Sequence, residues 1–159
     1  LAKRKNVGNV IAQSEIQRSL YSYTLSIDLD RVGKDGELEI KEEEKADRVD
    51  RLLDAVHYLY RDIKGRRENL SPIFVIGGRY ERKNPFFENR IRVEENRLNT
   101  VPLQEIMNEE TQIREHTFVG VMTGMFENEE EIRKSLHPGT VGEAFAGLKK
   151  EVKDYYEGH

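Results

Sequence analysis

The stretch at residues 21–29, YSYTLSIDL, alternates large apolar residues with small or polar ones. A period of two is typical of a β-strand with one buried face. We therefore expect a strand at 19–29, in a sheet that has one covered face and one open face. The Lys34-Asp35-Gly36 stretch predicts a turn after this strand.

A helical period replaces the alternation over residues 42–63. Apolar residues recur there every three or four positions, at Ala46, Val49, Leu53, Val56, Tyr60 and Ile63. Gly65 lies just beyond the last of them, where helices commonly end. The run IFVI at 73–76 predicts a short buried strand, which completes a strand–helix–strand unit.

The second half of the chain continues with shorter elements. We expect an edge strand at 90–94, a helix at 101–108 that Thr100 begins with Pro102 in its first turn, and a strand at 117–122. Two helices should follow, one capped by Asn128 and one by a Thr140–Glu143 capping box. The apolar stripe of the last helix should be Val141, Phe145, Leu148, Val152 and Tyr155, with an end near Gly158.

This order of elements predicts an α+β fold. The sheet should be antiparallel and ferredoxin-like or RNA-recognition-like, with helices on one face, followed by C-terminal helices. We expect residues 1–127 to form the RNA-recognition-like palm and residues 128–159 to be a helical extension of the same domain.

Composition narrows the class of protein. The chain has 159 residues, of which 35 % are charged, and it has no Cys. No disulfide or thiolate metal site can therefore form. We find no apolar run long enough for a membrane span and no signal segment, so we expect a cytoplasmic protein. The abundance of Glu, Arg and Lys also fits a thermophile.

The formal net charge of −4 hides an uneven distribution. Residues 1–97 carry 20 Lys or Arg and 18 Asp or Glu, a net charge of +2. Residues 98–159 carry 6 and 12, a net charge of −6. Because a polyanion responds to the local field, the positive part is the candidate for binding nucleic acid, although charge runs are more often solvated surfaces.

Three clusters in the positive part are candidate RNA-binding residues, and their members are Lys64, Gly65, Arg66 and Arg67, then Arg79, Arg82 and Lys83, and finally Lys3, Arg4 and Lys5. Guanidinium groups suit bidentate phosphate contacts, and arginine or aromatic planes, such as that of Tyr80, stack on unpaired bases. The first two clusters flank the predicted strand at 73–76, and we expect them to converge on one end of the sheet. An equally weighted alternative is that Lys64 and Arg66 only neutralise the C-terminal end of the helix.

Signals for catalysis or metal binding are weak. His57, His116, His137 and His159 form no metal-binding pair, and His57 fits a packed helix position better than a catalytic one. Asp28 and Asp30 could hold Mg²⁺ with a phosphate, but carboxylates at a strand end are more often plain turn residues. The acidic residues 42–44 and 129–131 are expected to stabilise helix N-termini. We expect no catalytic residue, no metal and no cofactor.

Four stretches carry a resemblance to a known family: RSLYSYTLSIDLDRVG at 18–33, RVDRLLDAVHYLY at 48–60, DIKGRRENLSPIFVIGG at 62–78, and the C-terminal FENEEEIRKSL with TVGEAFAGLKKEVKDYY. The chain resembles the C-terminal half of the DevR-like autoregulators among CRISPR-associated proteins. These are the RAMP-type backbone subunits of type I Cascade complexes.

The resemblance implies a function and partners. Such subunits polymerise head to tail along CRISPR RNA and hold it for pairing with target DNA. It assigns guide-RNA backbone contacts to residues 64–67, a place near RNA to residues 3–5, and a palm surface to the polar face of the strand at 19–29. The implied partners are CRISPR RNA, further copies of the chain, other Cascade subunits and, indirectly, target DNA, with no membrane.

Two other functions stay open. One is a ferredoxin-like ribonuclease that processes CRISPR RNA with His116 or His137 as general base. The other is a non-enzymatic interaction module that presents its last helix to a partner.

Overall fold

The computed structural model describes residues 19–158. The described elements, in chain order, are a 3₁₀ turn η1 (Leu29–Arg31), β1 (Lys34–Asp35), β2 (Leu38–Glu39), α1 (Glu42–His57), β3 (Tyr60–Ile63), β4 (Arg66–Asn69), β5 (Phe74–Gly78), β6 (Val93–Glu94), β7 (Arg97–Leu98), α2 (Val101–Glu109), α3 (Thr111–Glu115), β8 (Thr117–Val121), α4 (Glu129–Leu136) and α5 (Val141–Glu157). The mixed content of helices and small antiparallel sheets confirms the predicted α+β class.

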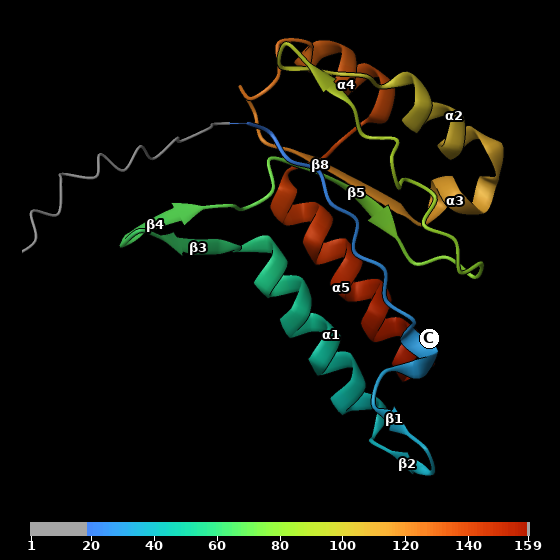
Figure 1. The fold of residues 1–159 in the computed structure, drawn as a ribbon. Coiled ribbons are helices and arrows are strands. Elements are labelled where there is room, and N and C mark those ends of the chain that lie inside the picture. The colour runs from blue at the N-terminus through green and yellow to red at the C-terminus, as the bar shows by residue number, and fades with distance from the viewer. Residues whose placement is uncertain (1–18, 159) are drawn as a thin grey trace, which may run out of the picture.

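The centre of the fold is the antiparallel pair β5–β8 (Figure 1). Its register runs from Phe74 opposite Val121 to Gly78 opposite Thr117. Since successive side chains on a strand point to opposite faces, Val75 lies on one face of the pair, and Phe74 and Ile76 lie on the other. The first face packs against a cluster from α1 and α5, and the second against a separate cluster.

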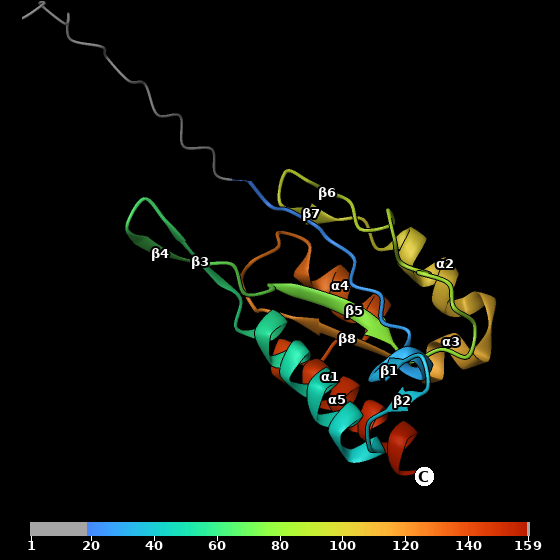
Figure 2. The same cartoon turned by 60° about the horizontal axis from the view of Figure 1, so that its bottom comes forward.

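Helices α1 and α5 run side by side below the strand pair (Figures 1 and 2). Val49 and Leu53 of α1 are buried with Phe145, Val152 and Tyr156 of α5. The packing of α5 on β8 is close, because a Cβ atom added at Gly147 would lie 2.3 Å from the Phe118 ring.

The opposite face of the strand pair is also covered. Its cluster draws side chains from β7, α2, α3, α4 and β8, and the fully buried members include Leu98, Leu103 and Ile132. The open sheet face expected from the sequence is therefore not present in β5–β8.

The predicted strand at 19–29 is wrong. Residues 19–28 have no regular secondary structure, and η1 begins at Leu29. Their segment runs past β5 (Figures 1 and 2), yet no described strand forms a ladder with it. Ile27 and Leu29 pack against the α1–α5 cluster, whereas Tyr21 and Tyr23 are exposed. The alternation reflects a side-chain pattern, but a strand also needs a hydrogen-bonding neighbour.

The helix predicted over 42–63 ends six residues early, at His57. The chain then turns back on itself as the β3–β4 hairpin, residues 60–69. Lys64 and Gly65 form its turn, with φ angles of 50° and 79°. Positive φ at both central residues is typical of a type I′ turn, which matches the twist of a two-stranded hairpin.

The β1–β2 hairpin is fastened to the start of α1 by a buried lysine. The Lys45 ammonium group donates to Glu39, and to Glu42 at 2.6 Å. These hydrogen bonds, led by the one to Glu39, raise the pKa of Lys45. Glu42, Glu43 and Glu44 occupy the first turn of α1, where negative charge favours the helix N-terminus as predicted.

Several predictions for the second half are confirmed. Thr100 precedes α2 with Pro102 in its first turn, and Thr140 and Glu143 form the complete capping box of α5. Asn128 begins α4, although its side chain bonds to the backbone of Leu98 instead of capping the helix.

Two details of the second half differ from the prediction. Tyr156, not Tyr155, is the buried tyrosine near the end of α5. The expected edge strand at 90–94 is reduced to β6, which pairs only with β7. The ferredoxin-like sheet is thus represented, among the described residues, by the pair β5–β8 alone.

Candidate nucleic-acid interface

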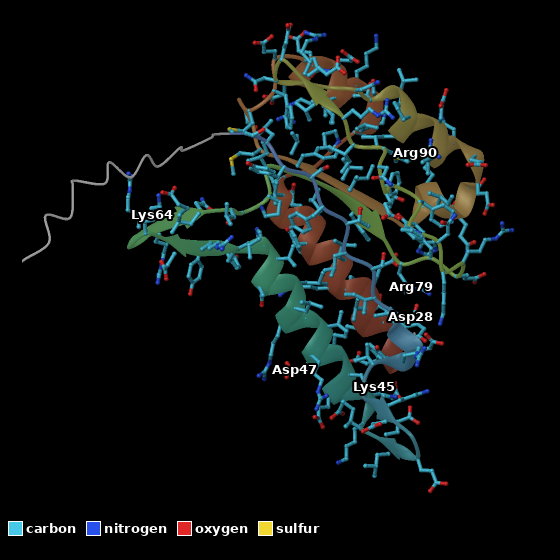
Figure 3. All side chains as sticks on the ribbon, in the orientation of Figure 1. Asp28, Lys45, Asp47, Lys64, Arg79 and Arg90 are labelled. Carbon is cyan, nitrogen blue, oxygen red and sulfur yellow. The ribbon has the colours of Figure 1, made fainter. Side chains whose placement is uncertain are left out.

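The predicted RNA-binding residues do not meet at one place. Residues 64–67 lie on the β3–β4 hairpin, which precedes β5, and residues 79–83 lie in the loop that follows it. Figure 3 shows Lys64 on the projecting hairpin and Arg79 far from it, near the other end of β5. The expected convergence on one end of the sheet is therefore wrong, because the first group precedes β5 and the second follows it, so the strand lies between them. Lys3, Arg4 and Lys5 lie outside the described residues.

The β3–β4 hairpin projects from the body of the molecule (Figure 1). Its register pairs Tyr60 with Asn69, Arg61 with Glu68, Asp62 with Arg67 and Ile63 with Arg66. Directly opposed residues share a face, and alternate residues along a strand do too. The hairpin therefore has a tyrosine face (Tyr60, Asp62, Arg67, Asn69) and an arginine face (Arg61, Ile63, Arg66, Glu68).

The side chains of the tyrosine face contact one another. The Arg67 guanidinium group lies 4.3 Å from the centre of the Tyr60 ring. The Arg67 Nε atom is 3.4 Å from a carboxylate oxygen of Asp62, its directly opposed residue. This arrangement combines a cation–π contact with a surface ion pair.

The side chains of the arginine face make fewer contacts with one another. In the described part of the chain Arg66 has one ion pair, to Glu68 at 3.9 Å. Arg61 has no ion pair or hydrogen bond within residues 19–158. The Arg66 and Arg67 side chains are 82 % and 67 % exposed, so water already solvates both. Such surface ion pairs are weak and open easily to a competing phosphate.

The cations that follow β5 are each paired with a different element. Arg79 lies 3.5 Å from Glu151 of α5, and Arg82 lies 3.3 Å from Glu110. Lys83 contacts Asp28 at 3.4 Å and Asp30 at 2.8 Å. The hydrogen bond from Lys83 lowers the pKa of Asp30, and the same contact raises the pKa of Lys83. These three cations therefore join segments of the molecule, and the Asp28–Asp30 pair serves Lys83.

A half-buried polar cluster lies beside Arg79. The Nδ1 atom of His116 is 2.8 Å from Glu151, whose second carboxylate oxygen faces Arg79. Both that oxygen and Arg79 Nε are buried, and neither has a hydrogen-bond partner among the residues that the structure describes. Next to them the Tyr80 hydroxyl lies 2.7 Å from Thr117 Oγ1. Burial raises the pKa of Tyr80 to about 12, so the phenol is neutral at physiological pH.

The other described histidines have simpler surroundings. His57 stacks on Phe145 with ring centres 4.6 Å apart, which confirms the expected packed position. His137 ends α4 in a left-handed conformation and is exposed. Within residues 19–158 no three His, Asp or Glu side chains gather closely enough to hold a metal ion.

The β3–β4 hairpin was not predicted from the sequence. Its residues Tyr60 and Arg61 were therefore not among the candidate RNA-binding residues. The available signal was Lys64-Gly65, because a glycine in the second turn position favours a type I′ hairpin. Tyr60 and Ile63 fitted the helical period by chance, and this coincidence concealed the signal.

Taken together, the fold and this interface define an α+β protein with a projecting cationic hairpin. The family model described as CRISPR-associated negative auto-regulator DevR/Csa2 matches residues 2–99, and the chain belongs to this family. The matched part contains the β3–β4 hairpin and the loop after β5, and it ends before α2.

No curated protein and no solved structure matches the chain. The C-terminal stretch that contributed to the resemblance lies beyond the matched residues. As to membranes, no helix in the described part of the chain has the length and apolar character of a bilayer span.

Proposed function

We propose that this CRISPR-associated chain is a backbone subunit of a type I Cascade complex that binds CRISPR RNA through its phosphates. The proposal rests on the family and on one structural observation: the β3–β4 hairpin presents exposed cations away from the body. Phosphate contacts carry no sequence information, so they suit a subunit that holds guides of any sequence. Lys3, Arg4 and Lys5 are proposed to add to the same attraction.

We propose that the hairpin contributes more to RNA binding than the loop after β5. Arg79, Arg82 and Lys83 already have acidic partners, and a phosphate would have to displace them. We therefore expect the loop after β5 to contribute less to RNA affinity than residues 61–67.

A charge-reversal experiment tests the hairpin. In the Arg66→Glu/Arg67→Glu variant, affinity for a mixed-sequence single-stranded RNA should fall about tenfold or more at low salt, because the hairpin loses two positive charges and gains two negative ones. Arg48→Glu/Arg51→Glu on α1 is the matched control, since it changes the net charge equally at exposed ion-paired sites. If the two variants bind RNA equally well, the hairpin assignment is wrong.

Head-to-tail assembly is the second part of the proposal. It requires two different surfaces that fit each other. The positive residues 1–97 and the negative residues 98–159 offer such a difference in charge. Sedimentation should show that longer single-stranded RNAs recruit more copies of the chain. One copy per RNA at every length would contradict assembly.

The ribonuclease alternative keeps one supporting observation. His116 is held by Glu151 at 2.8 Å, and a carboxylate on one ring nitrogen orients an imidazole as a general base. Incubation with repeat RNA distinguishes the two functions. Cleavage that the His116→Ala substitution abolishes would favour the enzyme, whereas intact, retained RNA favours the backbone subunit.

The interaction-module alternative has less support. The apolar stripe of α5 is buried against α1 and the strand pair, which leaves only its polar side for a partner. RNA retention that falls with salt would argue against this alternative.

A further inference from the structure

The arginines on the two faces of the β3–β4 hairpin differ in how many contacts they already make within the protein. Arg67 lies over the Tyr60 ring and beside Asp62. A phosphate that binds Arg67 must replace at least one of these contacts. Arg61, on the other face, has no ion pair or hydrogen bond to give up within residues 19–158.

The two faces also differ in net charge, and the arginine face is the more positive one. On the tyrosine face, Arg67 and Asp62 are directly opposed and cancel each other. On the arginine face, Arg61 and Arg66 share a single acidic neighbour, Glu68, whose one ion pair, at 3.9 Å to Arg66, is at the outer limit of such contacts. Only the arginine face keeps a net positive charge.

Geometry also favours two contacts on that face. Ile63 is directly opposed to Arg66, and Arg61 is two residues before Ile63 on the same strand. Arg61 and Arg66 are thus diagonal neighbours, whose Cα atoms are about 7–8 Å apart in an antiparallel pair. Two long guanidinium side chains at this spacing can reach phosphates of one strand.

We infer that the hairpin binds single-stranded RNA by its arginine face, through Arg61 and Arg66, while the tyrosine face stiffens the hairpin by its own contacts. This inference rests on the proposed function and adds Arg61 as a phosphate-binding residue. It also assigns Arg67 to the internal contacts of the hairpin.

Two substitutions separate the faces. Arg61→Gln removes one cation from the arginine face, and Asp62→Asn/Arg67→Gln removes the opposed pair from the tyrosine face without changing the net charge. Arg51→Gln, at an exposed position of α1, controls for the loss of one positive charge. Binding of a mixed-sequence single-stranded RNA is measured over a series of salt concentrations.

Arg61→Gln should weaken binding about three- to tenfold at low salt and reduce the slope of log K against log salt by about 0.7, the value of one phosphate contact on a single strand. Arg61→Lys should restore the slope, because the charge returns. The Asp62→Asn/Arg67→Gln pair and Arg51→Gln should bind within about twofold of the parent.

The failures are distinguishable. If the parent binds RNA and Arg61→Gln has no effect, or if the tyrosine-face pair loses as much affinity, the assignment of the face is wrong and the proposed function stands. If the parent does not bind RNA even at low salt, the proposed function fails and the inference with it.

Discussion

Lys83 donates hydrogen bonds to both carboxylate oxygens of Asp30, at 2.8 and 2.9 Å. This contact joins the loop after β5 to the segment before β1, more than 50 residues away in sequence. The Tyr156 hydroxyl donates to the Leu29 carbonyl at 2.6 Å and holds the same segment against α5. A cation that the sequence placed in an RNA-binding cluster thus fixes the path of the chain.

The Lys83–Asp30 pair should make stability depend on acidic pH. Because the pKa of Asp30 is lowered in the folded chain, its contribution is present above the ordinary pKa and is lost as the pH falls through the folded value. Asp30→Asn should lower Tm by about 1–3 °C at pH 7 and by less at pH 3. An equal loss at both pH values would show that the charge of Asp30 plays no part.

The buried side of α1 should not tolerate a charge. Leu53→Asp places an unpaired carboxylate in the α1–α5 cluster and should cost about 3–5 kcal/mol, enough to abolish a normal thermal transition. The neighbouring Leu52 is 40 % exposed, so Leu52→Asp is the matched control and should melt close to the parent. A normal melting curve for Leu53→Asp would contradict the described orientation of α1.

Close packing between α5 and β8 predicts a cost for a single methyl group. A Cβ atom at position 147 would meet the Phe118 ring at 2.3 Å, so Gly147→Ala should destabilise the fold by about 1–3 kcal/mol. At Gly142, also in α5, the nearest atom to an added Cβ is 3.9 Å away. Gly142→Ala should instead be neutral or stabilising by about 0.5–1 kcal/mol. Urea unfolding of both variants measures the difference, and equal effects would refute the packing argument.

Tyr80 and Tyr156 should lose their phenolic protons at a higher pH than an exposed tyrosine does. Burial raises the pKa of Tyr80, and likewise that of Tyr156, to about 12. A raised folded pKa means that stability is intact below pH 10 and falls as the pH rises towards 12. In a spectrophotometric titration, Tyr80→Phe should remove part of the absorbance step near pH 12 and leave the step near pH 10. Loss of amplitude near pH 10 would show that Tyr80 is accessible to solvent.

Local signals predicted the second half of the chain well. The capping box of Thr140 and Glu143 and the start of α2 at Thr100 with Pro102 depend on residues within one turn, and the structure contains both elements. The α+β class followed from the same kind of information. The buried tyrosine is Tyr156 and not the predicted Tyr155. The apolar period of a helix therefore predicts its buried residues only to within one position near the helix end.

The failures concern strand pairing, which the apolar period of one segment does not show. Residues 19–28 alternate apolar and polar side chains as a strand does, but they have no strand partner in the described structure. The local sequence does not show whether such a partner exists. Tyr60 and Ile63 satisfied the helical period, yet the turn at Lys64 and Gly65 placed them in a hairpin. The two basic groups precede and follow β5, so the strand between them already sets them apart, and the expected convergence overlooked this.

The most direct test of the account is to map where single-stranded RNA contacts the chain. Ultraviolet crosslinking of the parent to a mixed-sequence RNA, followed by mass spectrometry, identifies the contacting peptides. We expect crosslinks within residues 58–69, which contain the β3–β4 hairpin and its exposed cations. Crosslinks confined to other parts of the chain, such as residues 79–92 or α5, would contradict it.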